Sequence, residues 1–364
     1  MNTSSLFSLR FVAAIIVVLF HESPISSFLG TAPKILTAGS QAASFFFVLS
    51  GFILALAHYN DDKFSVGEYY QKRMARILPV YLIALSLWVA LDIAKGQLDP
   101  IALVLNIFLL QSWFPSYPLS INAPAWFLSD LTFFYIAFPF ILALLKKYST
   151  DPKRVLLTGI VFWLTTQAVL AALLNTSFYE GYPSQSHDYI FYFPPSHLCS
   201  FVLGICGAYF LLNNKDRFPM TYAKSVSIIL LLIAVIAIAI EYQSEYNEAS
   251  PLMLPFEASF YAPLFLLLII AFCVSDKRIA AVLSWSPLVY LGGISFSVYI
   301  MQSPVNRILR LRGDMYHLSN DEFILFFIFV LIVVGMFMRH AVEQPINVYL
   351  RKRSENPKVG PTRQ

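Results

Sequence analysis

The chain is dominated by apolar runs that are long enough to cross a lipid bilayer. A transmembrane helix needs about 20 predominantly apolar residues to span the hydrocarbon core. Runs of this kind lie near residues 6–22, 40–58, 74–94, 126–145, 155–174, 197–212, 224–241, 258–274, 286–303 and 322–341. Hydrophobic residues make up 58% of the 364 positions and charged residues only 13%, which is more apolar surface than a water-soluble globule of this size can bury. We therefore predict an all-α polytopic integral membrane protein with about ten transmembrane helices.

One further apolar run is too short to cross the membrane. The run Ile101–Trp113 is bracketed by Pro100 and Pro115, which favours a re-entrant or interfacial helix. We expect the spans to form one transmembrane domain over residues 1–350, followed by a polar, cytoplasmic tail over residues 351–364.

The distribution of basic residues predicts the orientation. An N-terminus in the cytoplasm puts 20 of the 25 Lys and Arg residues on the cytoplasmic side and leaves outside Lys34, Lys95, Arg307, Arg310 and Arg312. Both termini are therefore predicted to be cytoplasmic. Because the basic residues are dispersed over loops, they indicate contact with membrane lipids and argue against a nucleic-acid partner. The outward arginines at 307, 310 and 312 are read as a solvated helix face or a lipid-headgroup contact, with an anionic partner as the alternative.

The first span carries two isolated polar side chains, Arg10 and His21, in the segment SLRFVAAIIVVLFH. Eleven helical steps of about 1.5 Å separate them by roughly 16 Å, which is about three turns, so both lie on one face. Arg10 is expected near the cytoplasmic edge and His21 in the outer half. A snorkelling arginine and an interfacial histidine are the structural alternatives to a functional pair.

A second basic group precedes the third span, where Arg73 and Arg76 lie three residues apart in QKRMARILPVY. Their spacing places them on one helical face at the cytoplasmic side, where Arg10 is also expected. The excess of positive charge on cytoplasmic loops accounts for such a pair without any further role. The functional alternative is that the three guanidinium groups hold a polyphosphate cofactor.

In their order and spacing, four stretches of this chain resemble the membrane-bound acyltransferase family 3, the bacterial O-acyltransferases that modify cell-surface polysaccharides. They are the segment Arg10 to His21, the FFFVLSGFILA block around Ser50, the RMARILPVY block with Arg73 and Arg76, and the WFLSDLTFFYIAFP block from Trp126. Weaker similarity follows near Ser295 and at the EQP tripeptide, so the resemblance runs nearly end to end.

The resemblance implies a multi-pass enzyme of the bacterial cytoplasmic (inner) membrane. It implies transfer of an acetyl or other short acyl group from acyl-CoA to a hydroxyl of a cell-surface polysaccharide or its lipid-linked oligosaccharide precursor. Arg10, Arg73 and Arg76 are then candidates for binding acetyl-CoA. His21 is the candidate general base, because imidazole is well suited to take a proton near neutral pH. Trp126 and Tyr135 are candidates for binding the acceptor substrate, although such aromatic residues also serve as interface anchors.

Asp130 is the candidate partner that would fix the tautomer of His21, with a purely structural buried carboxyl as the alternative. The family more often has Glu five residues after the tryptophan, where this chain has Leu131. Glu22 points about 100° away from His21 and is expected at an exposed rim. Gln302 occupies a position where many relatives have His, which argues against an essential second imidazole. The SGF sequence at Ser50 is expected to let two helices approach closely rather than to supply a nucleophile.

Other classes of function remain open. A transporter or flippase for a glycan or a small anionic substrate also fits many spans with intramembrane Arg, His and Asp, and a sensing protein is a third alternative. A transporter predicts two related halves, which the sequence does not display. No metal site is expected, because no His, Cys and acidic residues have metal-ligand spacing. The sequence leaves the oligomeric state open, including a homo-oligomer.

Overall fold

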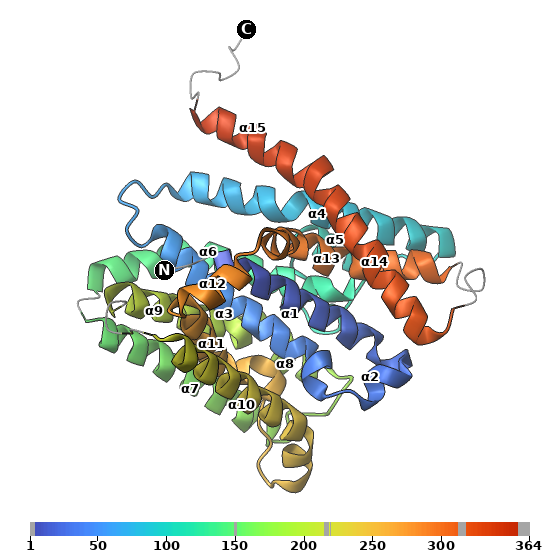
Figure 1. The fold of residues 1–364 in the computed structure, drawn as a ribbon. Coiled ribbons are helices and arrows are strands. Elements are labelled where there is room, and N and C mark those ends of the chain that lie inside the picture. Colours follow the sequence, from blue (N-terminus) through green and yellow to red (C-terminus); the bar gives the residue numbers. More distant parts are fainter. Residues whose placement is uncertain (1–3, 149–150, 215–217, 219, 312–317, 356–364) are drawn as a thin grey trace.

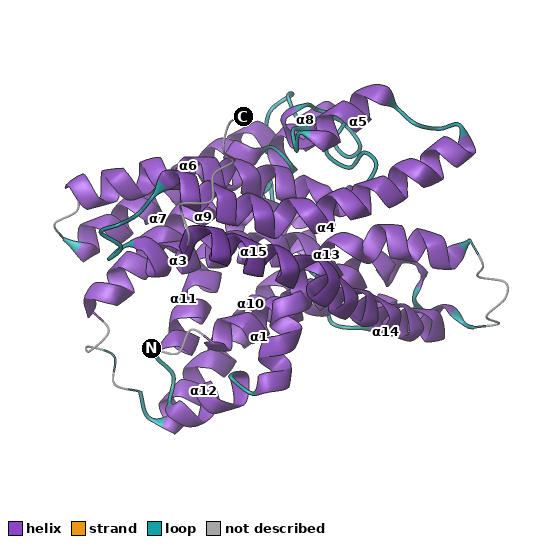
Figure 2. Cartoon of the chain, turned by 90° about the horizontal axis from the view of Figure 1, so that it is seen from above, coloured by secondary structure: helices purple, strands orange, loops and turns teal. Residues whose placement is uncertain are grey.

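The computed structural model describes residues 4–148, 151–214, 218, 220–311 and 318–355, and side chains up to residue 350. Helices and their connections make up the described part of the chain (Figure 2). Within it, nine helical segments are long and apolar enough to cross a membrane. They are built on α1 (Ser4–Glu22), α3 (Gly39–His58), α4 (Val66–Lys95), α6 (Trp126–Tyr148), α7 (Pro152–Leu174), α9 (Pro194–Asn214), α10 (Tyr222–Ala249), α13 (Ser286–Arg310) and α14 (Asn320–Met338). The protein is therefore a polytopic helical membrane protein, as predicted.

Shorter helices connect these segments. They are α2 (Ser27–Thr31), α5 (Pro100–Ile107), α8 (Gln185–Phe191), α11 (Ala262–Cys273), α12 (Lys277–Leu283) and α15 (Gln344–Glu355). Single turns of 3-10 helix cover Ser23–Ile25, Lys34–Thr37, Gln111–Trp113 and Ala123–Ala125, and π-helical turns cover Phe256–Phe260 and Arg339–Glu343.

The tenth predicted span, residues 258–274, is not one long helix. Its regular part, α11, has 12 residues, because Ala258 and Ser259 leave the helical conformation and Ser259 has a φ of 68°. A 12-residue helix rises only about 18 Å. The chain nevertheless returns along α10: the Tyr261 hydroxyl donates to the carbonyl of Ala239 at 3.1 Å, and the amide of Asp276 donates to Ser225 at 3.0 Å. A cytoplasmic position of both termini requires this return to complete a tenth crossing, and the orientation stays a prediction.

The run Ile101–Trp113 forms the short helix that was predicted. The Asp99 carboxylate accepts hydrogen bonds from the amides of Ile101 and Ala102 and caps α5, which has Pro100 in its first turn. The helix ends after eight residues, so it does not span a membrane. At the other end of the chain, α15 continues past the predicted domain boundary at residue 350 and projects from the bundle (Figure 1), and residues 356–364 lie outside the described residues.

The close approach expected at SGF is confirmed between α3 and α9. A Cβ added to Gly51 would overlap the carbonyl of Phe201, and one added to Gly204 would overlap the carbonyl of Val48. Both glycines are therefore needed for two backbones to touch, as is typical of membrane helix pairs. A similar contact joins α13 to α1, where a Cβ on Gly292 would overlap the carbonyl of Phe7. Figure 1 shows α1 in the middle of the bundle, beside α3 and α13.

Gly51→Ala is expected to destabilise the protein by about 1–3 kcal/mol, because the new methyl group must push α3 and α9 apart. Thermal unfolding of the purified protein in detergent measures the effect as a lower melting temperature. Gly67→Ala is the matched control, since a Cβ there meets nothing within 4 Å. Equal melting temperatures for the two variants would show that the crossing tolerates the methyl group.

Candidate functional site

Two helices in contact, α1 and α13, each present one polar face to the interior of the bundle. On α1 this face carries Arg10 and His21. On α13 it carries side chains at helical spacing, namely Ser295, Tyr299, Gln302 and Asn306. The two faces line two pockets, one at each end of the Arg10 to His21 stretch. We call them the Arg10 pocket and the His21 pocket.

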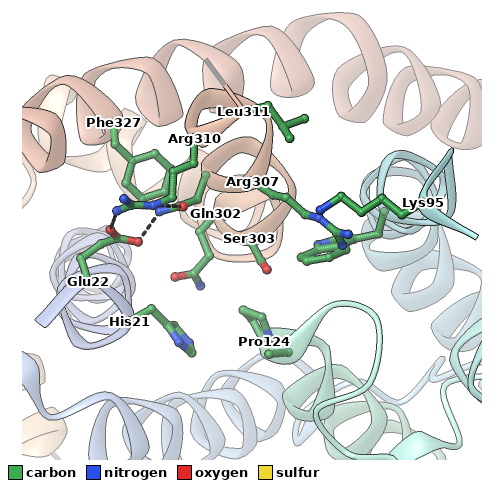
Figure 3. Close-up of a pocket in the computed structure, with 13 residues that line it drawn as sticks. His21, Glu22, Lys95, Pro124, Gln302, Ser303, Arg307, Arg310, Leu311 and Phe327 are labelled. Carbon is green, nitrogen blue, oxygen red and sulfur yellow. Dashed lines mark hydrogen bonds and ion pairs between the residues drawn. The ribbon is translucent and has the colours of Figure 1, made fainter. Parts of the chain in front are cut away.

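The His21 pocket has a volume of about 420 Å³ and is lined by α1, α4, the turn at Ala123–Ala125, α13 and α14 (Figure 3). The His21 side chain is exposed into this pocket and points toward Pro124. Its ring lies edge-on to Phe20, with 5.2 Å between centroids. No hydrogen bond to the imidazole is formed by the described residues, so both ring nitrogens are available to a ligand.

Glu22 is buried and paired, so the expectation of an exposed rim residue is wrong. Only 5% of its surface is exposed, its Oε2 accepts a hydrogen bond from Arg310 Nη2 at 2.8 Å, and its Oε1 accepts one from the Asn306 amide (Figure 3). The reason is that α13 turns Arg310 toward α1. This network fixes the end of α1 that carries His21.

Arg307 is also turned inward, which corrects the expectation of a solvated stripe. Its Nη1 pairs with Asp92 Oδ1 at 2.8 Å, and its guanidinium covers the Trp88 ring at 4.0 Å. Both partners lie on α4, four residues apart on one face, and this spacing is the sequence signal that could have revealed the contact. Arg312 lies outside the described residues. The sequence reasoning thus missed that Arg307 and Arg310 belong to the His21 pocket.

Two other side chains that line the His21 pocket each carry a polar group that lacks a partner among the described residues. Lys95 has no carboxylate partner among the residues that the structure describes, and Figure 3 shows it at the far side of the pocket from His21. Gln302 is 3% exposed, and its amide donates to the carbonyl of Tyr299 at 2.7 Å. The Gln302 Oε1 is buried without a hydrogen-bond partner in the described structure. Gln302 thus carries a buried acceptor oxygen with no partner beside this pocket.

The Arg10 pocket is lined by two of the three predicted arginines, and the third, Arg73, lies beside the lining residue Tyr135. Arg10 and Arg76 both line it, and its volume is about 40 Å³. The Arg73 guanidinium lies 5.9 Å from the ring centroid of Tyr135, which also lines the pocket. Arg10 interacts electrostatically with Arg76, Arg73 and Glu343. Tyr135 therefore lies with the arginines and not in the His21 pocket, where an acceptor-binding residue was expected.

The three arginines share an uncompensated positive charge. Within the described parts of the chain, none of them forms an ion pair, and the Arg73 Nε is buried without a hydrogen-bond partner. Ser50 also lines the Arg10 pocket, next to the glycine of the α3–α9 crossing. A pocket with several guanidinium groups and no carboxylate at contact distance is suited to an anion with several oxygen atoms.

Asp130 and Trp126 lie away from the His21 pocket. Asp130 is fully buried near Ser112 and Tyr299, and no hydrogen bond joins it to His21. Trp126 packs against the ring of His197, with 5.4 Å between centroids. The expected His21–Asp130 pair is therefore not formed, because α6 turns Asp130 into the core instead of toward α1. The roles proposed for Asp130 and Trp126 stay predictions.

Tyr299 separates the two pockets. Its ring lines the Arg10 pocket, and its hydroxyl donates to the carbonyl of Pro124 at 3.0 Å. Pro124 in turn lines the His21 pocket. Tyr299 is 4% exposed, so it forms a wall between a basic pocket and a histidine pocket.

This arrangement defines a membrane protein with a basic pocket and a histidine pocket at opposite ends of one helix face. Comparison with known proteins identifies its family. Residues 5–339 match the family described as the acyltransferase domain, so the chain belongs to this family, as its resemblance indicated. The protein is a membrane acyltransferase.

Two relatives support the assignment. Acyltransferase MdmB of Streptomyces mycarofaciens is 29% identical over 96% of this chain and 92% of its own length. YrhL of Bacillus subtilis, assigned as a peptidoglycan O-acetyltransferase, is 24% identical over 85% of this chain and 50% of its own length. This chain thus spans about half the length of YrhL. No solved structure matches the chain.

Proposed function

We propose that this acyltransferase moves an acetyl or similar short acyl group from acyl-CoA in the cytoplasm to a hydroxyl of a cell-surface polysaccharide or its lipid-linked precursor, in the bacterial inner membrane. The observation that carries the proposal is the pairing of two pockets on one face of α1. Arg10 lies in one, His21 lies in the other, and helix rise separates them by roughly 16 Å. An extended phosphopantetheine arm has a length of that order.

The donor is proposed to bind by its phosphates at Arg10, Arg73 and Arg76. Guanidinium groups bind phosphate oxygens through paired hydrogen bonds, and these three lack a carboxylate at contact distance in the described structure. The Arg10 pocket is too small for a nucleotide or a sugar, since about 40 Å³ is little more than the volume of one water molecule in the liquid. The acyl-bearing arm is the narrowest part of the donor, and its passage to His21 requires the Tyr299 ring to move aside.

The acceptor is proposed to bind in the His21 pocket. Its hydroxyl oxygen attacks the thioester carbonyl carbon while a ring nitrogen of His21 takes the hydroxyl proton. The carbon–sulfur bond then breaks, and the departing thiolate receives the proton from the imidazolium. The Glu22, Asn306 and Arg310 network holds the end of α1 that carries His21. A glycan acceptor also agrees with the peptidoglycan in the name of YrhL.

Membrane vesicles of defined orientation test the proposal. Radiolabelled acetyl-CoA does not cross lipid unaided, so inside-out vesicles are expected to incorporate label into surface glycan and sealed right-side-out vesicles are not. Label in the right-side-out vesicles alone would place the donor site on the opposite side. Transport of the glycan without any incorporation of acetyl label would instead support the transporter alternative.

A further inference from the structure

The connection between α14 and α15 brings another arginine to the donor side of the bundle. It is a π-helical turn over Arg339–Glu343, and it contacts both α4, which carries Arg73 and Arg76, and α13. π-helical turns insert one extra residue per turn and are frequent at functional sites. Arg339 opens this turn with helical dihedrals, φ −59° and ψ −48°.

The Arg339 guanidinium lies against the backbone of Gly293, where any other residue would force the guanidinium to shift. A Cβ added to Gly293 of α13 would overlap Arg339 Nη1. One turn earlier, the ring of Tyr290 lies under the guanidinium, with 5.0 Å from Cζ to the ring centroid. The Arg339 guanidinium therefore packs against both Gly293 and Tyr290.

No carboxylate neutralises Arg339 within the described residues. Its Nε is buried without a hydrogen-bond partner, and it interacts electrostatically with Arg76. The nearby Glu343 is engaged elsewhere, because its Oε1 accepts a hydrogen bond from the Ser297 hydroxyl at 2.5 Å. Glu343 reaches Arg10 and Arg76 only as a longer-range charge. Arg10 and Arg76 thus share one carboxylate at longer range, and Arg339 has none at contact distance among the described residues.

We propose that Arg339 is a fourth anion-binding residue of the donor site and that it binds a phosphate oxyanion of acyl-CoA together with Arg76. This inference rests on the proposed donor site. Assembling like charges in a partly dehydrated site is unfavourable unless an anion joins them. The pyrophosphate of coenzyme A is an anion of that class, and anionic lipid headgroups share its chemistry.

Equilibrium binding of radiolabelled acetyl-CoA to the purified full chain tests the role of Arg339. Arg339→Ala is expected to weaken binding at least 10-fold, and Arg339→Lys less, because it keeps the charge and loses the planar fork. Gly293→Ala is expected to weaken binding similarly by displacing the guanidinium. Gly67→Ala, in open space, is expected to bind like the wild type. Inorganic pyrophosphate is expected to compete with acetyl-CoA in the wild type and more weakly in Arg339→Ala.

Steady-state kinetics distinguish a loss of acetyl-CoA binding from misfolding of the variant. Arg339→Ala is expected to raise the KM for acetyl-CoA, while kcat at saturation stays within about twofold of wild type. Arg339→Lys is the second variant if the alanine variant misfolds.

The lipid dependence of acetyl-CoA binding distinguishes the two anions. The binding assay is repeated in nanodiscs of phosphatidylcholine, with and without phosphatidylglycerol. The loss of affinity is expected in both. A loss that appears only with phosphatidylglycerol would show that Arg339 binds a lipid headgroup and would overturn the proposal.

The outcomes separate this inference from the proposed function. Normal acetyl-CoA binding by Arg339→Ala and Gly293→Ala, together with weak binding by Arg76→Ala, would remove Arg339 from the donor site and leave that site standing. Normal binding by Arg76→Ala as well, or an absence of acetyl-CoA binding by the wild type, would overturn the donor site itself and with it the role of Arg339.

Discussion

Replacing His21 by alanine is expected to lower kcat for acyl transfer about 10²–10⁴-fold, the range typical for loss of a general base. The physical reason is that His21 is the imidazole exposed into the larger pocket, and the described residues leave both of its ring nitrogens free. Donor affinity is expected to stay within about twofold of wild type, because the arginines lie in the other pocket. Transfer of labelled acetyl to glycan and equilibrium binding of acetyl-CoA measure the two quantities.

His187→Ala is the matched control for His21. This histidine lines neither the Arg10 pocket nor the His21 pocket and packs against Phe191, with 4.5 Å between ring centroids. Its removal is expected to leave kcat within about twofold of wild type. Full transfer activity in His21→Ala would contradict the assignment of the base and would direct attention to Ser50, which lines the Arg10 pocket.

The second large effect is expected from the double variant Arg10→Ala, Arg76→Ala. A hydrogen bond to a charged group contributes about 1.5–3 kcal/mol, which is about 10-fold to 150-fold in affinity for each arginine. Because both side chains line one pocket of about 40 Å³, the losses are not expected to add fully. The Kd for acetyl-CoA is therefore expected to rise at least 100-fold, while the bundle stays folded because like charges are removed.

Arg154→Ala is the control for charge alone. Arg154 is exposed on α7 and paired with Asp151 at 3.7 Å, so its loss changes the net charge without touching either pocket. Acetyl-CoA binding is expected to be unchanged. Similar losses in Arg154→Ala and in the double variant would show a general effect of membrane charge in place of a site. Accessibility labelling of the N-terminus identifies any variant whose orientation has changed.

The sequence predicted the spans well because each is a local property. Apolar runs near 40–58 and 155–174 became α3 and α7, with ends set by short polar segments. The run at 258–274 misled because hydropathy does not report the conformation of Ser259, where the chain takes a positive φ. Together with Ala258, this residue interrupts the helix without changing its hydropathy.

Residue positions in the site were predictable where the residues share one helix. Contacts between helices that are distant in sequence were not predictable. The one-face spacing of Arg10 and His21, and that of Arg73 and Arg76, correctly placed the arginines together. The pairing of Glu22 with Arg310 joins residues far apart in sequence, so no periodicity reveals it. Asp130 was misplaced for the same reason, because the depth of a residue in the membrane does not say which neighbour its side chain faces.

The wall formed by Tyr299 also has an electrical consequence. A continuous aqueous path from the Arg10 pocket to the His21 pocket would let protons run down the membrane potential, which is worth about 2.3 kcal/mol per elementary charge at 100 mV. The ring of Tyr299, pinned by its hydroxyl to the Pro124 carbonyl, interrupts that path with a packed aromatic side chain. The residue that separates the two pockets is therefore also an electrical barrier between them in this conformation, and the arm of the proposed donor must move it aside to reach His21.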